Sequence, residues 1–529
     1  MKADRLRNTE SSRRRSGGRS ARKAMRAATE GRPKAVWAGL AGGAYKPLSD
    51  QDLTRIHAAA LTILADIGIA DPTPGVAELA CNAGCTLDAA GRLRFPRALV
   101  EDMVAKAARS YTVHSRNPRF DDIVVGGKSV NFATSGEAVS VLDLKSRTFR
   151  PSTIRDLYDF ARVVDSLDNI HQFGQTVVPT DLDDLFEHDI NVAYALMAGT
   201  EKPCEMTFNS VTHIGPAIEL FDMVAGGEGK FAARPFVSFG GCPIVSPLRF
   251  AADNLDVLVE TSRHGMINDI AIAPQAGATA PARLAGTLAQ VTAEGLACLC
   301  IVNLIRPGCP MSFANWPFAV DLRTGSFSGG SGEVAVASAA AAQIGRFYDL
   351  PTTVAASMSD SKLPDAQAGY EKGISAVVAG LAGANRVLES AGMLGSLMGC
   401  SFEALVIDND MLGMAQRILR GVEVTDDTLG LEGIRAAALG AGHYLGAEET
   451  LAAMETEYLY PNLADRRSTQ VWAAEQPTDM LERASAKADD LLANYFPDHI
   501  DPALDRRIRE RFPIRIDPEM MCKSDAQKR

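Results

Sequence analysis

An aromatic loop is the first feature of this sequence that could do chemistry. Trp316 lies in the string Asn315-Trp316-Pro317-Phe318, directly after a short extended stretch at 311–314. The face of an indole ring binds cations with about 0.5–2 kcal/mol. The loop therefore indicates either a site for a cationic group or a tryptophan that packs beneath its own loop.

The most polar loop follows another extended stretch, at 352–356. It carries Ser359, Asp360 and Lys362 and leads into a helix that begins near Gln367. The Asp360 carboxylate could face a cationic ligand, with Lys362 paired to it or to Asp365. The alternative is a capping network for the helix that follows.

A glycine-rich loop, Ser328-Gly329-Gly330-Ser331-Gly332-Glu333, opens a further predicted helix. Backbone N–H groups at a helix start can hold an anion. The loop lacks the lysine and the spacing of a phosphate-binding loop. A tight turn is therefore favoured over a phosphate site.

Proton-transfer and metal-binding patterns are scarce. The eight histidines form neither His-x-His nor His-Glu-x-x-His, and none falls in the predicted loops after strands, so we expect neither a metal site nor serine–histidine catalysis. The nine cysteines are odd in number, scattered, and without zinc or iron–sulfur spacing. Such thiols are typical of a reducing compartment, so we expect a cytoplasmic protein.

The elements that would position these residues alternate regularly. From residue 128 onward, eight extended stretches each precede a helix, beginning with 130–134 and 152–164 and ending with 386–390 and 403–420. Such alternation predicts a parallel sheet with helical crossovers, and eight units predict a closed (β/α)8 barrel with its active site at the carboxyl ends of the strands. The first strand is followed by Ser135-Gly136-Glu137, so the fingerprint of a dinucleotide-binding open sheet is missing.

Other segments flank the predicted barrel. We expect a basic, poorly ordered arm at 1–34, an N-terminal helical layer at 35–127, the catalytic barrel at 128–424 and a C-terminal helical extension at 425–529. The arm carries a net charge of +9, which leaves −20 for the rest of a chain whose net charge is −11. It is either a solvated tail or a docking element for an acidic protein or nucleic acid.

The body of the chain excludes two kinds of partner. Its acidic balance argues against nucleic acid and against an anionic membrane surface. No run approaches the ~20 uninterrupted apolar residues of a membrane-spanning helix. We expect a homo-oligomer, since barrels of this size often associate, although no isolated apolar stripe marks an interface.

Short motifs spread over the chain beyond the arm resemble those of the trimethylamine methyltransferase family. These enzymes are corrinoid-dependent methyltransferases and include a glycine betaine branch. The matching strings are Gly42-Gly43-Ala44-Tyr45-Lys46-Pro47-Leu48, Asp156-Leu157-Tyr158, Ala161-Arg162, Asp165-Ser166-Leu167-Asp168-Asn169-Ile170, Pro307-Gly308-Cys309-Pro310, Asp360-Ser361-Lys362, Pro364-Asp365-Ala366-Gln367, Gly442-His443-Tyr444-Leu445-Gly446, Tyr460-Pro461 and Asp465-Arg466.

The resemblance implies a barrel that passes a methyl group from a methylated amine to cob(I)alamin on a separate corrinoid protein. Archaeal trimethylamine enzymes of the family use pyrrolysine at a position near 357–360, where this chain has standard residues only. This difference favours a quaternary amine, such as glycine betaine, over a tertiary amine. A quaternary ammonium leaves as a neutral amine and needs no protonation, so position and electrostatics suffice.

On this basis we assign roles to candidate residues. Asp360 and Glu137 are the catalytic candidates that offset the substrate charge. Trp316, Phe318 and Tyr370 would line the trimethylammonium group, with Ser359 beside them, and Asn209 and Gln175 would donate to a carboxylate. The candidates that face the corrinoid are Gly329, Gly330, Ser331 and Gly392. Trimethylamine, carnitine and proline betaine remain alternative substrates, and a barrel that binds quaternary amines without turnover remains an alternative function.

Overall fold

The computed structural model describes residues 34–475 and 477–522. The described residues form two compact units, the larger within 36–429 and 459–522 and the smaller of 34–35 and 430–458. Apart from Lys34, the predicted basic arm lies outside the described residues.

Eight parallel strands form the centre of the larger unit, and they close into a barrel. Each strand pairs with the next along the chain, and the last pairs with the first. A parallel bridge between Ala133 and Gln172 joins the first strand to the second and completes the ring. The strands are β7 (Ser129–Phe132), β10 (Phe173–Gly174), β11 (Cys204–Met206), β12 (Val237–Gly241), β15 (Asn268–Ile270), β17 (Met311–Ala314), β20 (Thr352–Ala355) and β21 (Arg386–Leu388).

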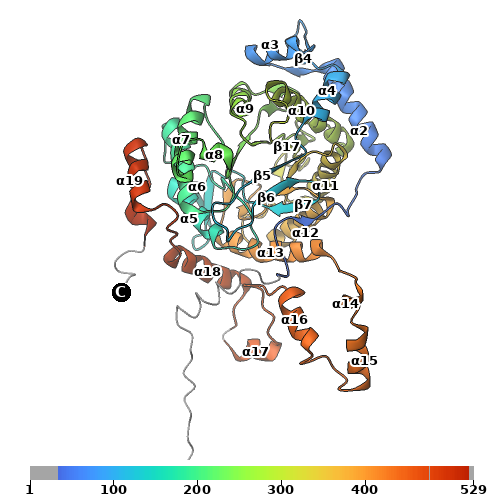
Figure 1. The fold of residues 1–529 in the computed structure, drawn as a ribbon, viewed down its shortest axis with the longest axis vertical. Coiled ribbons are helices and arrows are strands. Elements are labelled where there is room, and N and C mark those ends of the chain that lie inside the picture. The colour runs from blue at the N-terminus through green and yellow to red at the C-terminus, as the bar shows by residue number, and fades with distance from the viewer. Residues whose placement is uncertain (1–33, 476, 523–529) are drawn as a thin grey trace, which may run out of the picture. The chain divides into compact units, whose positions relative to one another are not determined.

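One helix follows each strand, and together these helices form the outer ring in Figure 1. The predicted (β/α)8 barrel is thus confirmed, with all eight units in their expected order. The helices are α5 (Ile154–Asp165), α6 (Leu185–Gly199), α7 (Ile214–Ala225), α9 (Ala252–His264), α10 (Leu284–Ile305), α11 (Gly332–Phe347), α12 (Ala366–Ala382) and α13 (Phe402–Arg420).

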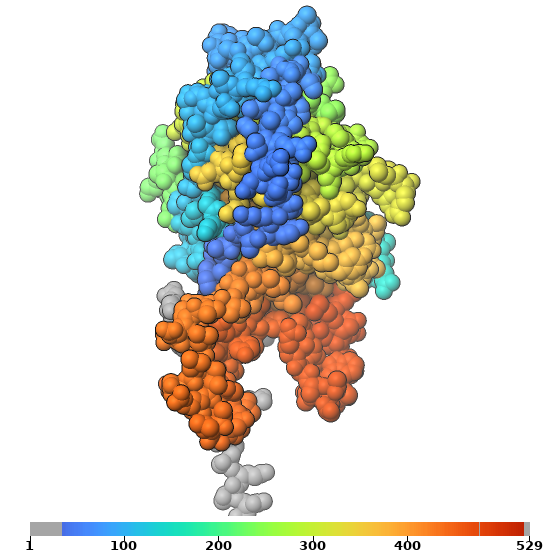
Figure 2. All heavy atoms as spheres, turned by 90° about the vertical axis from the view of Figure 1, so that its right-hand side faces the viewer, coloured from blue at the N-terminus to red at the C-terminus, as the bar shows by residue number. Residues whose placement is uncertain are grey.

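Helix α10 explains how a strongly apolar segment fits this barrel. It is the one helix in the described part of the chain that is long and apolar enough to cross a membrane, yet 89% of its most apolar window is buried inside the protein. Its neighbours include α9, α11 and the N-terminal helices α2 (Asp50–Thr62) and α4 (Arg97–Lys106). Figure 2 shows the blue N-terminal segment lying across the yellow barrel helices.

The sequence analysis expected the N-terminal layer at 35–127 to be helical, but the layer also contains strands. Besides α2, α3 (Pro74–Asn82) and α4, it contains short strands, because residues 69–70 and 92–94 find partners in a small five-stranded sheet. A hairpin of β5 (Ser110–Val113) and β6 (Ile123–Gly126) covers the amino-terminal end of the barrel. From it, the Tyr111 hydroxyl lies 2.9 Å from Asp269 Oδ1 and 2.5 Å from Ser312 Oγ.

The described residues after α13 contain six α-helices. Helices α15 and α16 belong to the smaller unit, and none of their residues is buried. Helix α18 packs against α13 and α5, and α19 against α7. The helices are α14 (Asp426–Leu429), α15 (Leu431–Leu439), α16 (Glu448–Thr456), α17 (Thr469–Ala474), α18 (Met480–Asn494) and α19 (Pro502–Arg511).

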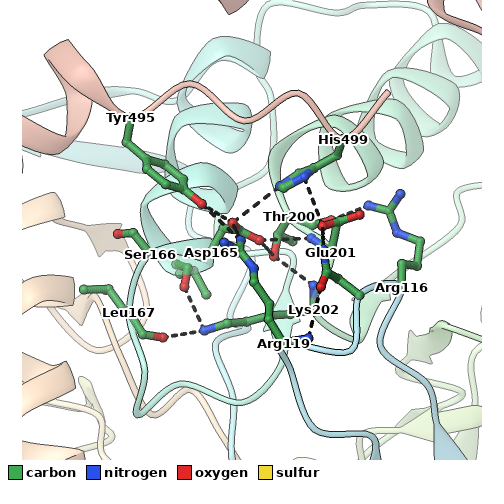
Figure 3. Close-up of polar contacts among 12 residues, drawn as sticks. Arg116, Arg119, Asp165, Ser166, Leu167, Thr200, Glu201, Lys202, Tyr495 and His499 are labelled. Carbon is green, nitrogen blue, oxygen red and sulfur yellow. Dashed lines mark hydrogen bonds and ion pairs between the residues drawn. The ribbon is translucent and has the colours of Figure 1, made fainter. Parts of the chain in front are cut away.

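A buried ionic network fastens the connection between α18 and α19 to the barrel. The Asp165 carboxylate accepts hydrogen bonds from Arg119 and Tyr495, and the His499 ring lies 3.4 Å from Asp165 and 3.3 Å from Glu201 (Figure 3). Burial alone would lower the pKa of His499, but the hydrogen bonds to the two carboxylates raise it. Two acidic partners thus favour the charged imidazolium in the folded protein.

Candidate functional site

An ion pair between Arg386 and Asp269 shows which side chains point into the barrel. Strands β21 and β15 are separated by two other strands, so these side chains can meet only inside the barrel. The Arg386 guanidinium also donates to Gln172 Oε1 at 3.0 Å. This buried polar layer lies next to the Tyr111 hydroxyl and forms the floor of the interior.

Beyond this floor, most interior positions carry very small side chains, and Leu388 is a larger exception. In a parallel sheet, paired residues point to the same face, and side chains alternate along each strand. The register around Asp269 and Arg386 therefore places a set of glycines and alanines inside. These residues are Ala133, Gly174, Gly240, Ala271, Ala314 and Ala355. Barrel interiors are ordinarily filled by bulky branched residues. The small residues at these positions therefore differ from those of an ordinary barrel interior.

A carboxyl group projects into this region from β11. Glu205 is paired with Gly174 on one side and Ser238 on the other. A Cβ atom added to Gly240 would lie 2.9 Å from Glu205 Oε1, so the glycine leaves room for the carboxyl. Burial, and then the charge of Asp269, raise the pKa of Glu205 to about 8.

Two further carboxyls approach Glu205 from neighbouring loops. Glu389 follows β21 with a φ of +63°, and Glu137 follows β7 with a φ of +49°. Left-handed backbone of this kind is uncommon outside glycine and re-aims the side chain. Burial and the charges of the other two glutamates raise the pKa of Glu389 well above its ordinary value, and burial also raises that of Glu137. We call Glu137, Glu205 and Glu389 the glutamate cluster.

Several buried polar atoms of this region lack a hydrogen-bond partner within the protein. They include Glu205 Oε2, Glu389 Oε2, Thr176 Oγ1, Gln175 Oε1 and Trp316 Nε1. Buried polar groups in native proteins are nearly always satisfied, so a group of unsatisfied ones at the carboxyl ends of barrel strands indicates a binding site.

An aromatic wall stands at the same end of the barrel. Trp316 lies two residues beyond Ala314, so the alternation of β17 directs its indole inward. Its ring centroid is 6.3 Å from that of Phe318, which in turn makes an edge contact with Phe327 at 4.9 Å. The structure therefore brings two of the predicted aromatic residues together.

Sequence comparisons place the chain in a known family. The family model for trimethylamine methyltransferase matches residues 15–518. The chain belongs to the trimethylamine methyltransferase family. It is 30% identical over 466 residues to a glycine betaine methyltransferase of Desulfitobacterium hafniense, covering 88% of this chain and 96% of the relative. It is equally 30% identical over 461 residues to a trimethylamine methyltransferase of Methanosarcina barkeri, covering 85% of this chain and 91% of the relative.

Among solved structures, the chain is similar to the monomethylamine methyltransferase of Methanosarcina barkeri. The TM-score is 0.44 at 14% identity, covering 85% of this chain and 95% of the other. The family match makes this protein a methyltransferase related to enzymes of methylamine and betaine metabolism.

Of the two catalytic candidates in this family member, the structure places only Glu137 in the cluster. Its Oε1 accepts a hydrogen bond from Thr207 Oγ1 at 2.7 Å. The Asp360 carboxylate is already engaged by four donors, namely Ser328 Oγ at 2.6 Å, Gly329 N at 2.8 Å, Gly330 N at 3.1 Å and Ser396 Oγ at 2.7 Å. Asp360 therefore clamps the glycine-rich loop to the loop after β21.

Three other substrate-binding candidates lie apart from the cluster or are engaged elsewhere. Tyr370 is 57% exposed on α12 and is not among the residues packed around Trp316. The hydroxyl of Ser359 donates to Glu371 Oε2 at 2.7 Å. Asn209 donates to Asp189 at 2.6 Å, and the same carboxylate binds His213 at 2.7 Å. Gln175, in contrast, is buried with an unpaired Oε1.

The four residues predicted to face the corrinoid differ in exposure. Gly330 and Ser331 are half-buried, and the Ser331 side chain caps α11. Gly329 is buried against Met358. Gly392 is also buried, with its N–H donated to Asp408 at 2.8 Å, so the structure does not present it at the surface.

Glu205 and Glu389 were missed because the sequence analysis considered only residues after the strands. The available signal was an acidic residue inside or directly beside a strand of otherwise apolar residues. Such residues are almost never fully buried without a reason. The strings Cys204-Glu205-Met206 and Val387-Leu388-Glu389 both carry this signal.

Proposed function

We propose that this methyltransferase removes a methyl group from a quaternary ammonium compound held by the glutamate cluster and Trp316. The observation that carries the proposal is the convergence of three buried carboxyls in a region of glycine and alanine side chains. A bound cation would replace the missing counter-charge, and the indole face would add about 0.5–2 kcal/mol. Glycine betaine, the expectation from the sequence, belongs to this broad class.

The electrostatics of the cluster suit the transfer itself. The substrate nitrogen is positively charged before transfer and neutral after it, so ionised carboxylates hold the substrate more strongly than the product amine. No side chain needs to protonate the leaving amine. The protein then contributes binding, orientation and exclusion of water, which account for much of the rate in reactions of this kind.

The methyl acceptor is proposed to be cob(I)alamin carried by a separate corrinoid protein. The described residues of the site offer no ready acceptor of their own. Cys242, which follows β12, is exposed to solvent, but the surrounding protein and the charges of Glu137 and Glu389 raise its pKa to about 11. The thiol is therefore protonated at neutral pH and a poor nucleophile. A corrinoid supplies a strong nucleophile from outside.

A methyl-transfer assay tests this proposal. The purified full chain is mixed with free cob(I)alamin and a panel of quaternary amines, and methylcobalamin is followed by its absorbance. We expect turnover with at least one quaternary amine and a loss of at least tenfold in Glu205→Gln. The exposed Glu78 on α3 provides the control variant Glu78→Gln, which should retain full activity. Binding of a quaternary amine without turnover, even with a corrinoid protein present, would support a non-catalytic binding barrel instead.

A further inference from the structure

We infer that the substrate of this site is a monocation whose remaining part is uncharged, such as a quaternary ammonium alcohol, and not a betaine that carries a carboxylate. This inference rests on the proposed function and narrows its substrate class. It follows from the charges that surround the glutamate cluster and from the uncharged polar atoms left beside it.

Acidic groups dominate the surroundings of the cluster. A Cβ added to Gly136, the residue before Glu137, would lie 2.2 Å from Glu389 Oε2, and burial and the charges of Glu205 and Glu137 raise the pKa of Glu389. Burial and the charges of Asp269 and Glu137 raise the pKa of Glu205, while that of Arg386, which is paired with Asp269, lowers it. A substrate carboxylate would enter this region as an additional negative group without a cation to receive it, which costs several kcal/mol in a buried site.

The imidazole nearest the cluster is also held by an acid. His188 acts on Glu137, and its Nδ1 lies 3.1 Å from Asp189 Oδ1. Asp189 in turn binds His213 through its other oxygen at 2.7 Å. Asp189 thus lies against both imidazoles, and His188 Nε2 is buried without a hydrogen-bond partner.

Cations at the same end of the barrel are engaged elsewhere. The Arg323 guanidinium makes two hydrogen bonds to Asp321, at 2.6 and 3.0 Å, on an exposed loop. Lys362 Nζ donates to the Asp360 carbonyl at 2.7 Å. Lys372 forms a buried ion pair with Asp408. Of these three cations in the described part of the chain, Arg323 and Lys372 are paired with carboxylates, and Lys362 is exposed to solvent.

Uncharged polar atoms are available instead. The Thr176 hydroxyl and the Trp316 indole N–H are both buried and unpaired. Each lies two residues beyond an interior position, Gly174 and Ala314 respectively, so strand alternation directs both inward. A hydroxyl on the substrate could bond to either atom without adding charge.

Calorimetry with the full chain at pH 8 tests the inference with four probes: choline, tetramethylammonium, glycine betaine and 3,3-dimethylbutanol. The last compound is the uncharged analogue of choline. We expect choline to bind at least tenfold more tightly than glycine betaine, tetramethylammonium to bind detectably, and dimethylbutanol not to bind. In Glu389→Gln, choline should bind more weakly and the preference over glycine betaine should shrink, while Glu78→Gln should match the parent chain.

The two possible failures are distinguishable. Binding of glycine betaine as tight as or tighter than that of choline would overturn this inference and leave the proposed function standing. If none of the three ammonium compounds binds, the proposed function itself fails and the inference fails with it. Because the comparison of ligands uses the unmodified chain, the outcome does not depend on whether a variant folds.

Discussion

Raising the pH from 7 to 9 should tighten binding of a quaternary ammonium ion about tenfold. The ammonium charge does not titrate, so a change in affinity must come from the protein. With the pKa of Glu205 at about 8, roughly one tenth of this carboxyl is ionised at pH 7 and roughly nine tenths at pH 9. If the cation binds only the ionised form, the dissociation constant falls by the same factor, which is about 1.4 kcal/mol.

The sign follows from linkage. A bound cation stabilises the ionised carboxylate and lowers its pKa, so binding below pH 8 releases a proton. Glu137 and Glu389 also have raised pKa values and would add to the release, whereas Cys242, with its pKa at about 11, stays protonated over this range.

Calorimetry at pH 7, 8 and 9 measures the effect directly. Repeating the titration at pH 7 in two buffers of different ionisation enthalpy counts the protons released. Glu205→Gln should bind more weakly and lose most of the pH dependence, and Glu78→Gln should keep the parent slope. Equal affinity of the parent chain at pH 7 and pH 9, with no proton released, would refute the assignment of Glu205 as the titrating counter-charge.

Three further outcomes are expected. Gly240→Ala places a Cβ 2.9 Å from Glu205 Oε1, so calorimetry should show ligand binding weakened at least tenfold. The control variant Gly369→Ala on α12, where an added Cβ meets nothing within 4 Å, should bind the ligand normally. Asp360→Ala removes four hydrogen bonds from two loops. Thermal unfolding should therefore show a free energy of unfolding lowered by about 1–3 kcal/mol, and a protease should cleave the variant near the glycine-rich loop. An unchanged melting curve would argue against the clamp. The pKa of His499 is raised in the folded protein. The stabilisation that the charged ring provides is therefore complete below the unfolded pKa of about 6.5 and is lost as the pH rises through the folded pKa. His499→Gln should lower Tm more at pH 6 than at pH 8, and an equal loss at both pH values would contradict the charged form.

The barrel could be predicted because each unit carries its own local signals. Polar residues precede many of the helices, and in the structure the side chains of Ser331, Asp365 and Ser401 cap the helices that follow them. Strand 311–314 was predicted with its observed bounds. Alternation of short apolar stretches with long helices then left few topologies to consider.

The site was harder to predict because it depends on contacts between distant segments. The donors to Asp360 come from residues 328–330 and 396, and nothing in the sequence near Asp360 indicates these partners. Glu389 reaches the cluster because its backbone has a positive φ, which its sequence neighbours do not indicate. Trp316 could be proposed from the sequence because it directly follows a strand, and strand alternation alone directs its side chain inward.

The glycines and alanines inside the barrel have a consequence for how the ligand preference of this chain can change. Because those positions contribute little apolar burial, the apolar burial that favours folding comes mainly from contacts between the strands and the surrounding helices, such as the largely buried α10. Exchanging one interior alanine for serine, or one glycine for alanine, would alter which ligand fits while sparing the shell that keeps the chain folded. Single substitutions at these positions should therefore change ligand preference without a compensating gain in stability.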